Sequence, residues 1–393
     1  MNYSLLSKLY YKNKDTYMCA YENRYNNEST IKFDLQISKN PAFLTCSFEL
    51  LNLISSIYRL DKRLENLANR LPGIALEQFT VKCLIDEISL TNEIEGVQST
   101  RKEINDILVE KNITKSNQRL FGLVKKYQLL SAQDLQINSC EDIRKIYDEL
   151  VLKEITADNP DNIPDGLFFR QNSVNVQNQH FKSIHRGIVP EQAIIEYMNK
   201  ALKILHDDSI EILIRISLFH YLFGYIHPFY DGNGRTSRFI SSYLLSQELH
   251  PLVSYSLSYT IKKNIHLYYN AFKYSNDPKN KGDLTPFILI FLEILQEAVS
   301  DLCEILTNKI EDFENLSRQL ETLVPPRIMD ILYILLQNTL FGEKGLSVYD
   351  IHDITHMSLP KIRTVLKESS EYLVVTKDGK VNNYQIDLEK VNE

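Results

Sequence analysis

The stretch that decides the fold of this chain is His227-Pro-Phe-Tyr-Asp-Gly-Asn-Gly-Arg-Thr-Ser-Arg238. Residues 210–226, directly before it, are apolar at a helical period and are followed by Pro228, so they predict a buried helix. After Gly234 the apolar residues again follow a helical period. The stretch therefore predicts a helix–loop–helix joint, with Gly232-Asn-Gly234 at the N-terminus of the second helix.

The residue types in this joint are those that bind and transfer phosphate groups. The first backbone N–H groups of a helix have no intrahelical partner, and glycines let an anion approach them closely. Arg235 and Arg238 are three residues apart, so both side chains can reach one side of the first turn. Asp231 supplies an oxygen ligand of the kind that holds magnesium together with substrate phosphates.

His227 is the group in this stretch that can accept a proton near pH 7. Together these residues predict phosphoryl or nucleotidyl transfer to a hydroxyl, with the histidine as the base. The alternative is a glycine-rich turn between two core helices, with solvated arginines.

The composition is that of an ordinary soluble protein: 393 residues, 44% hydrophobic and 24% charged, with a net charge of −7. This length predicts two or three domains, and the negative charge excludes a general polyanion-binding surface. The five cysteines form no CxxC pair, which indicates a reducing compartment. Because neither a signal peptide nor a membrane-spanning run is apparent, we expect a cytoplasmic protein without a membrane partner.

The stretch 227–238 resembles the signature of the Fic (filamentation induced by cAMP) family, His-Pro-Phe-x-Asp/Glu-Gly-Asn-Gly-Arg-x-x-Arg, at every fixed position. The resemblance implies a mainly α fold, in which a helical core carries a short β-hairpin flap. It also implies a protein adenylyltransferase, which moves AMP from ATP to a Ser, Thr or Tyr hydroxyl of a target protein. Self-modification and a homo-oligomer are further expectations of the resemblance.

The resemblance also implies roles for individual residues. His227 would deprotonate the attacking hydroxyl, Asp231 would hold Mg²⁺ against the phosphates, and Phe229 would anchor the loop in the core. The nucleotide-binding residues implied in this way are Gly232, Asn233, Gly234, Arg235, Thr236, Ser237, Arg238 and Asn264. Tyr268 and Tyr269 follow Asn264 in a segment that resembles the family's base-binding region, although core packing is the alternative for both tyrosines.

A second motif, Thr91-Asn-Glu-Ile-Glu-Gly96, ends a helix predicted over residues 76–95. It resembles the inhibitory motif of the Fic family, Ser/Thr-x-x-x-Glu-Gly/Asn. The resemblance implies that Glu95 pairs with Arg238 and inhibits the enzyme, while Thr91, four residues earlier on the same face, steadies the helix end. The alternative is a surface helix that ends in glycine.

The remaining pattern of the chain predicts mostly helices. A polar-tipped segment at 168–181 predicts a hairpin, which by resemblance is the flap that docks the target and otherwise is an ordinary surface hairpin. Residues 31–37 alternate as in one half-buried strand. Further helices are predicted at 42–71, 116–136, 140–156 and 282–320.

We expect three regions: an N-terminal helical region at 1–115 that contains the inhibitory helix, a catalytic core at 116–320, and a C-terminal domain at 325–393. The last is predicted to hold three helices and a hairpin, which resembles a winged helix. Its Lys361, Arg363 and Lys367 could face DNA, but eight basic and ten acidic residues give it a net charge of −2. That charge favours contact with protein over contact with DNA.

Three other functions stay open at this point. The same site could remove AMP, with Glu95 orienting a water molecule, or it could use another phosphate-containing donor. A transcription regulator that acts through the C-terminal domain is the third alternative, and the intact catalytic residues argue against it.

Overall fold

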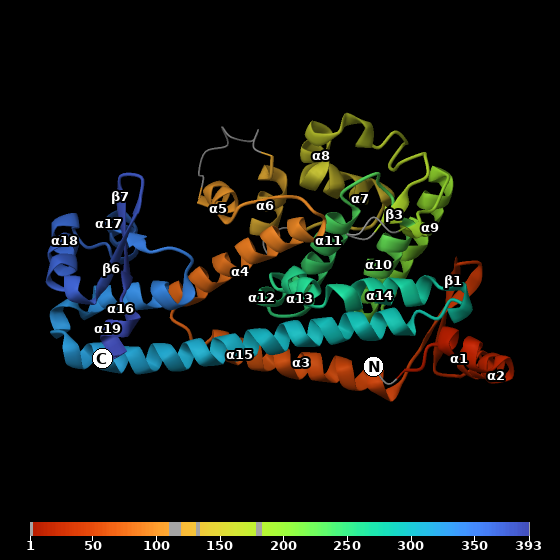
Figure 1. The fold of residues 1–393 in the computed structure, drawn as a ribbon, viewed down its shortest axis with the longest axis horizontal. Helices are drawn as coiled ribbons and strands as arrows, with labels where there is room; N and C mark the ends of the chain where they lie inside the picture. The colour runs from red at the N-terminus through yellow and green to blue at the C-terminus, as the bar shows by residue number, and fades with distance from the viewer. Residues whose placement is uncertain (1–2, 110–118, 131–133, 178–182, 393) are drawn as a thin grey trace. The chain divides into compact units, whose positions relative to one another are not determined.

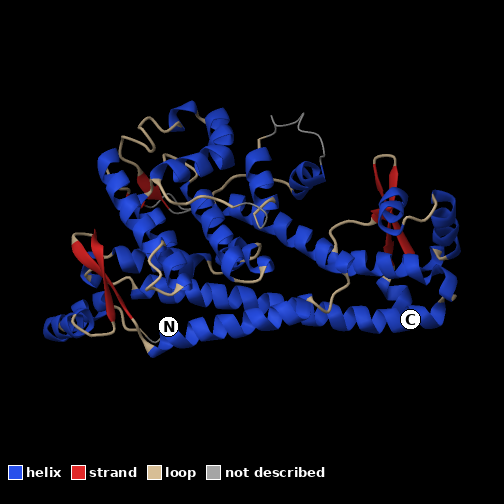
Figure 2. Cartoon of the chain, turned by 180° about the vertical axis from the view of Figure 1, so that it is seen from behind, coloured by secondary structure: helices blue, strands red, loops and turns tan. Residues whose placement is uncertain are grey.

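The structure, a computed structural model, describes residues 3–109, 119–130, 134–177 and 183–392. Helices dominate this part of the chain, and its strands form three small antiparallel sheets (Figure 2). The predicted mainly α fold is therefore confirmed. The chain divides into two compact units, one made of Met1–Asp61 and Ile85–Val299, the other of Lys62–Leu84 and Ser300–Glu393.

The chain begins with two helices and a β-hairpin: α1 (Leu6–Lys12), α2 (Lys14–Tyr25), β1 (Thr30–Ile37) and β2 (Asn40–Thr45). The predicted strand at 31–37 is present, but its partner β2 occupies the start of the helix predicted at 42–71. That helix, α3, runs only over Phe48–Ala68. The start was predicted wrongly because a short run of consecutive apolar residues is compatible with a helix as well as with a buried strand.

The centre of the first unit is the pair α10 (Ile212–Ile226) and α11 (Asn233–Glu248), the two helices predicted to flank the signature (Figure 1). Twelve of the fifteen residues of α10 are buried, as expected for a helix that is apolar on all sides. α9 (Glu191–Leu205), which the sequence analysis did not predict, packs against α10. The helix–loop–helix joint is therefore confirmed.

Several helices precede this pair along the chain: α4 (Gly73–Ile94), α5 (Arg101–Val109), α6 (Phe121–Gln128), α7 (Cys140–Tyr147) and α8 (Lys153–Asp158). A π-helical turn, Asp148–Leu152, joins α7 to α8, so the helix predicted at 140–156 is present. The helix predicted at 116–136 is shorter than expected, because residues 134–137 are not helical. Residues 116–118 and 131–133 lie outside the described part.

A hairpin is present, but later in the chain than the range 168–181 predicted for it: β3 (Asn175–Gln177) pairs antiparallel with β4 (Ser183–Arg186), which lies beyond that range. Its tip, residues 178–182, lies outside the described part. After α11 the first unit continues with α12 (Pro251–Ser254), α13 (Leu257–Lys263) and α14 (Ile265–Asn276). The long predicted helix follows as α15 (Thr285–Leu323).

The second unit ends in a small mixed array: α16 (Pro326–Phe341), β5 (Leu346–Ser347), α17 (Val348–Thr355), α18 (Leu359–Glu368), β6 (Leu373–Asp378), β7 (Val381–Ile386) and α19 (Leu388–Asn392). Three helices and a hairpin were predicted here, and the structure adds β5 and α19. The sheet order is β5-β7-β6, so the last strand lies in the middle. Short 3₁₀ turns at Pro160–Asn162, Pro278–Asn280 and Ser370–Tyr372 complete the described helices, none of which is long and apolar enough to cross a membrane.

Gly282 joins the N-terminal hairpin to the start of α15. Its carbonyl accepts a hydrogen bond from the Phe43 N–H (3.0 Å), and the Leu284 N–H donates to the Phe43 carbonyl (2.9 Å). Gly282 has a φ of +78°, and a Cβ added there would lie 2.3 Å from the Pro41 carbonyl oxygen. Both the backbone conformation and the close approach of β2 therefore require glycine.

We predict that Gly282→Ala lowers the free energy of unfolding more than Gly96→Ala does. Gly96 also has a positive φ, +74°, but a Cβ there meets nothing within 4 Å. In both variants the left-handed backbone lowers the free energy of unfolding by about 1–2 kcal/mol. Only Gly282→Ala loses a further amount, roughly 1–3 kcal/mol, because its Cβ overpacks against β2. Chemical denaturation of the two variants measures the difference. Equal losses would mean that β2 does not constrain the start of α15.

Candidate active site

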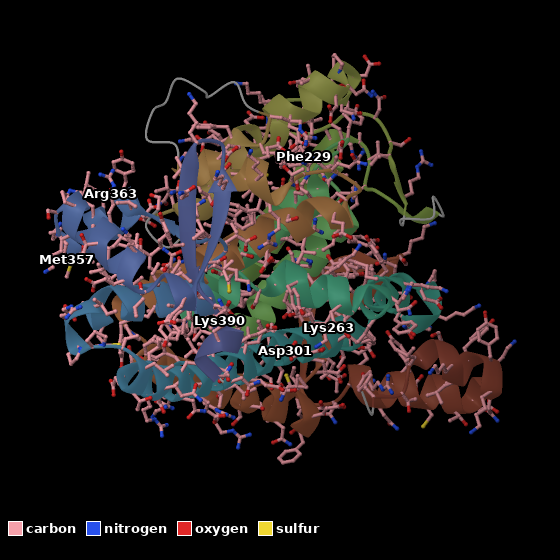
Figure 3. The ribbon with its side chains drawn as sticks, turned by 60° about the vertical axis from the view of Figure 1, so that its left-hand side comes forward. Phe229, Lys263, Asp301, Met357, Arg363 and Lys390 are labelled. Atoms are coloured by element: carbon pink, nitrogen blue, oxygen red, sulfur yellow. The ribbon has the colours of Figure 1, made fainter. Side chains whose placement is uncertain are left out.

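The signature loop begins where α10 ends in a left-handed turn. His227 caps this helix with φ 53° and ψ 64°, and its backbone N–H donates to the Phe223 carbonyl (2.9 Å). Two residues later the Phe229 ring, labelled in Figure 3, is fully buried, and it stacks on Tyr147 with ring centroids 3.7 Å apart. The expected anchoring of the loop by Phe229 is therefore present, and His227 lies two residues before this anchor in the chain.

Asn233, at the start of α11, holds the loop in shape. Its Oδ1 accepts from the Phe229 N–H (2.9 Å) and its Nδ2 donates to the Phe229 carbonyl (2.8 Å). The preceding Gly232 has a φ of +76°, and a Cβ there would lie 2.7 Å from Ile155 Cδ1. The side chain of Asn233 is therefore engaged in the loop itself, so a ligand can meet this residue only through its backbone.

The first turn of α11 carries the carboxylate of Glu95. A Cβ built on Gly234 would lie 2.0 Å from a Glu95 carboxylate oxygen, so this oxygen lies directly over the Gly234 backbone. The N-terminal end of a helix attracts anions through its free N–H groups and its dipole. A side-chain carboxylate thus lies at the position where the sequence predicts a bound anion.

Arg238 joins this carboxylate to α4. Its Nη2 donates to Glu95 Oε1 (2.8 Å) and to the Thr91 carbonyl (2.9 Å), and its Nε donates to Thr91 Oγ1 (2.8 Å). The Arg238 side chain is 1% exposed, whereas that of Glu95 is 27% exposed. Burial by itself lowers the pKa of Arg238, but the Glu95 carboxylate together with Tyr268 and Tyr127 raises it, and the net shift is upward.

A neutral histidine lies behind Arg238. His220 is fully buried between Ser241, whose Oγ is 2.8 Å from Nδ1, and Tyr268, whose hydroxyl is 2.8 Å from Nε2. Burial, and after it the charge of Arg238, lowers the pKa of His220 to about 3. Tyr268 is 6% exposed and burial raises its pKa, which agrees with the core-packing alternative for this residue.

Arg235 binds a different carboxylate. Its Nη1 lies 2.7 Å from Glu154 Oε2, and both side chains are at most 2% exposed. Burial raises the pKa of Glu154, against the lowering effect of Arg235 and of Arg119. Although the spacing of Arg235 and Arg238 allows both to reach one anion, the structure does not bring their guanidinium groups to one site.

Three other residues assigned by resemblance to nucleotide binding have side chains that are engaged within the protein. Thr236 Oγ1 donates to the Gly232 carbonyl (2.9 Å), and Ser237 Oγ lies 3.2 Å from His220 Nδ1. Asn264 Nδ2 donates to Glu297 (2.7 Å) on α15. The partners of Ser237 and Asn264 come from other helices, so spacing along the sequence does not reveal them, whereas the partner of Thr236 lies one turn back at the start of its own helix.

Glu87 belongs to the same face of α4 as Thr91 and Glu95, and the sequence analysis missed it. It is fully buried: Oε2 accepts from the Ser258 N–H (2.7 Å) and Oε1 from the Ser258 hydroxyl (2.6 Å). Burial raises its pKa to about 7, although the Ser258 hydrogen bonds and Arg238 lower it. The signal in the sequence was its spacing of four residues from Thr91, which places an acid on the buried face of a helix.

Asp231 has the position and chemistry of a magnesium ligand. It is exposed at the loop, and its Oδ1 accepts from the Gly232 N–H (2.5 Å). The described residues contain no cluster of three or more acidic, His or Cys ligands. A magnesium ion that is held by one carboxylate and by substrate phosphates needs no such cluster, so the residues present fit the ion.

Residues 137–245 match the model of the Fic/DOC family, and this range contains α10, the loop and all but the last three residues of α11. This segment of the chain is therefore a Fic domain. The chain is 27% identical over 255 residues to the Protein adenylyltransferase Fic of Drosophila ananassae, which covers 61% of this chain and 47% of that protein. The relative of the same name from Drosophila virilis is 32% identical over 94 residues, covering 24% of this chain and 18% of that protein.

The chain thus aligns with less than half the length of these relatives. Among solved structures, a Fic family protein from Desulfovibrio desulfuricans G20 has a TM-score of 0.52 at 20% identity. That likeness covers 87% of this chain and 97% of the other, and it supports a common fold.

The buried Glu87 makes stability depend on pH. Because its pKa is raised to about 7 in the folded protein, the folded state binds more protons than the unfolded state between about pH 4.5 and 7. Stability should therefore fall as pH rises through this window. We predict that Glu87→Gln, which keeps the neutral shape, gains thermal stability relative to wild type as pH rises from 5 to 7.5, as measured by melting temperature. Glu93→Gln, an exposed acid on the same helix, is the control, and parallel curves for Glu87→Gln and wild type would contradict the assignment.

Proposed function

We propose that this protein is a protein adenylyltransferase that transfers AMP from ATP to a Ser, Thr or Tyr hydroxyl and is held inactive by Glu95. The observation that carries the proposal is the position of the Glu95 carboxylate, over Gly234 and bonded to Arg238 at the first turn of α11. A helix N-terminus with an arginine beside it is a phosphate site, and here a carboxylate lies in it. The name of the Drosophila relatives, protein adenylyltransferase, supports the same activity.

In the proposed reaction His227 takes the proton of the incoming hydroxyl. The hydroxyl oxygen then forms a bond to the α-phosphorus of ATP, the bond from that phosphorus to the bridging oxygen breaks, and pyrophosphate leaves. The backbone N–H groups at the start of α11 stabilise the negative charge, and such fixed donors are usually the largest contribution to catalysis. Asn233 supports this step indirectly, because its clamp on Phe229 fixes the distance between His227 and α11.

Asp231 would hold magnesium in this scheme, and the ion when bound neutralises part of the charge of the phosphates. Arg238 would bind the terminal phosphates once Glu95 has left it. We assign Arg235 to holding α11 against α8, because release of its buried pair with Glu154 would strand a charge in the core. Gly232, Thr236, Ser237 and Asn264 would shape the nucleotide site through the backbone.

Inhibition by Glu95 follows from charge and space. Its carboxylate repels a phosphate at Gly234 and keeps Arg238 turned toward α4. ATP would then bind with its α-phosphate displaced from the line of attack, and small displacements of reacting atoms are costly. The same carboxylate, 27% exposed, is also placed to orient a water molecule, so AMP removal is the second candidate function.

For the C-terminal region, residues 325–393, we propose a winged-helix-like module that contacts protein. The order of its elements and the central position of β7 agree with that fold. Lys361, Arg363 and Lys367 are exposed on α18, where Figure 3 labels Arg363. Because the region as a whole carries a net charge of −2, we favour a target protein or a second copy of this chain over DNA as its partner. A cytoplasmic location fits this proposal.

The activity is tested by incubating the purified protein with ATP labelled at the α- or at the γ-phosphate. We predict protein-bound label from the α-position only, and its loss in His227→Ala with ATP binding retained, since the imidazole acts on the hydroxyl and not on the phosphates. His356→Ala is the matched control, because His356 also caps a helix in the left-handed conformation, with φ 57°. Label from the γ-position would indicate a kinase-like transfer instead.

The inhibitory role is tested in the same assay. We predict that Glu95→Gly raises the initial rate of self-labelling at least about tenfold, the scale on which misplacement of reacting atoms acts. Adding Arg238→Ala should return the rate toward that of wild type, because the phosphates then lack their cation. A Glu95→Gly variant no faster than wild type would reduce the motif at 91–96 to a helix end. Loss of an AMP-removing activity in Glu95→Gly would favour the second candidate function.

A further inference from the structure

Arg170 is a fully buried cation whose described partners are all backbone carbonyls. Its Nε donates to the His227 carbonyl (2.9 Å), Nη1 to Asn172 (2.5 Å), and Nη2 to Ile188 (2.9 Å) and to Ile226 (3.4 Å). Burial lowers its pKa to about 10, so it remains charged at neutral pH. A buried charge is costly, and its retention calls for a role that a neutral side chain would not fill.

The carbonyls bound by Arg170 belong to two structures. Ile226 and His227 form the C-terminus of α10 and the first residue of the signature, whereas Asn172 and Ile188 are the two feet of the β3–β4 hairpin. Backbone bonds repeat this link: the Arg170 N–H donates to the Pro228 carbonyl (3.1 Å) and the Ile188 N–H to the Ile226 carbonyl (3.1 Å). The carbonyls of three consecutive residues, 226 to 228, thus accept hydrogen bonds from Arg170 or from Ile188.

The guanidinium group of Arg170 carries N–H donors on three nitrogens in one plane, so it can bind carbonyls of both structures at once. His227 is left-handed, a conformation that costs a non-glycine residue roughly 1–2 kcal/mol and needs outside support. The negative end of the α10 dipole also favours a cation at this helix C-terminus. A lysine carries its donors on one nitrogen and cannot span carbonyls on both structures in the same way.

Tyr230, at one of the positions that the signature leaves unspecified, makes a second link to the Asn172 foot of the hairpin. Its hydroxyl donates to Asp165 Oδ1 (2.9 Å) and accepts from the Asn172 N–H (3.1 Å). On the other side of Arg170, the Glu191 carboxylate accepts from the backbone N–H groups of Phe168 and Phe169 (2.8 and 2.9 Å). The segment that carries Arg170 is therefore fixed on both sides of it.

We infer that Arg170 is a positioning residue that couples the β3–β4 hairpin to the backbone of His227, with the Tyr230 hydroxyl as a second tie. A segment docked on the hairpin and the base that acts on it are then held at a constant distance, which is what in-line transfer requires. This inference rests on the proposed function for its consequence in catalysis. The tie between the two structures is independent of that function.

The other reading is that Arg170 only fills space in the core. The two readings differ in what a conservative change does. Arg170→Lys keeps the charge and most of the volume but loses the planar group with three donor nitrogens, so a space-filling role predicts little change in rate. A positioning role predicts a lower rate per folded active site.

The test compares Arg170→Lys, Tyr230→Phe and Arg144→Lys in the Glu95→Gly background. Arg144 is the matched control, because its Nη1 also donates to a nearby carbonyl, that of Phe168 (3.2 Å), but it does not contact the signature. The readouts are self-labelling with α-labelled ATP, expressed per nucleotide-binding site by titration with ATP, and amide hydrogen exchange at Asn172 and Ile188.

We expect Arg170→Lys to lower kcat at least about tenfold with the KM for ATP unchanged, and to speed amide exchange at Ile188. Tyr230→Phe should speed exchange at Asn172 and lower kcat by a smaller factor, whereas Arg144→Lys should change none of these. Unchanged kcat and unchanged exchange in Arg170→Lys would overturn the inference.

If Arg170→Lys does not fold, Tyr230→Phe decides, and normal kcat with normal exchange at Asn172 overturns the inference. If the parent Glu95→Gly protein transfers no AMP, the proposed function fails. Hydrogen exchange then still tests whether Arg170 links the hairpin to the signature. Faster exchange at Ile188 in Arg170→Lys supports this link, and unchanged exchange rejects it.

Discussion

The clamp between Asn233 and the backbone of Phe229 is the interaction on which the rest of the site depends. Asn233 closes the loop between α10 and α11 by hydrogen bonds to both the N–H and the carbonyl of Phe229. The Phe229 ring is in turn fixed in the core against Tyr147. With the loop closed, the left-handed end of α10 and the N-terminus of α11 have a set separation. The proposed proton acceptor, His227, and the proposed anion site at the start of α11 are thereby held close to each other.

Three buried arginines surround this loop, and the kind of partner that each one has suggests its role. Arg170 binds carbonyls and Arg235 binds the buried Glu154, so neither can change partner without leaving polar groups unsatisfied in the core. Arg238 also has a fixed partner in Thr91, but its Glu95 partner is 27% exposed. Water or a phosphate can replace that carboxylate at lower cost, which makes Arg238 the arginine suited to exchange between an internal anion and a ligand.

The helix that leads into Glu95, α4, is itself part of a buried polar network. Glu87 binds Ser258 of α13, Thr91 binds Arg238, and Arg238 lies next to Tyr268, which contacts His220. Successive turns of α4 thus contact different parts of the first unit through one face. Because these groups are buried and depend on one another for hydrogen bonds, displacement of Glu95 alone costs less than displacement of the whole helix end. If Glu95 inhibits the enzyme as proposed, a local movement of its side chain is enough to release Arg238.

The sequence by itself determined the joint of α10 and α11 and the resemblance of its loop to the Fic signature. The joint is encoded in apolar spacing over a few helical turns, and the resemblance in a motif with many specified positions. The pairing of Glu95 with Arg238, two residues far apart in the chain, was an expectation of that resemblance, and the structure contains it. Only the tertiary structure decided that Arg235 pairs with Glu154, that Asn264 binds Glu297, and that Arg170 holds His227. It also decided that residues 40–45 are a strand and not the start of α3. For the three polar contacts the physical reason is that a buried polar or charged group takes its partner from whichever element packs against it, and that partner lies tens of residues away in the sequence. For residues 40–45 the reason is that a short apolar run becomes a strand only where another strand, here β1, pairs with it.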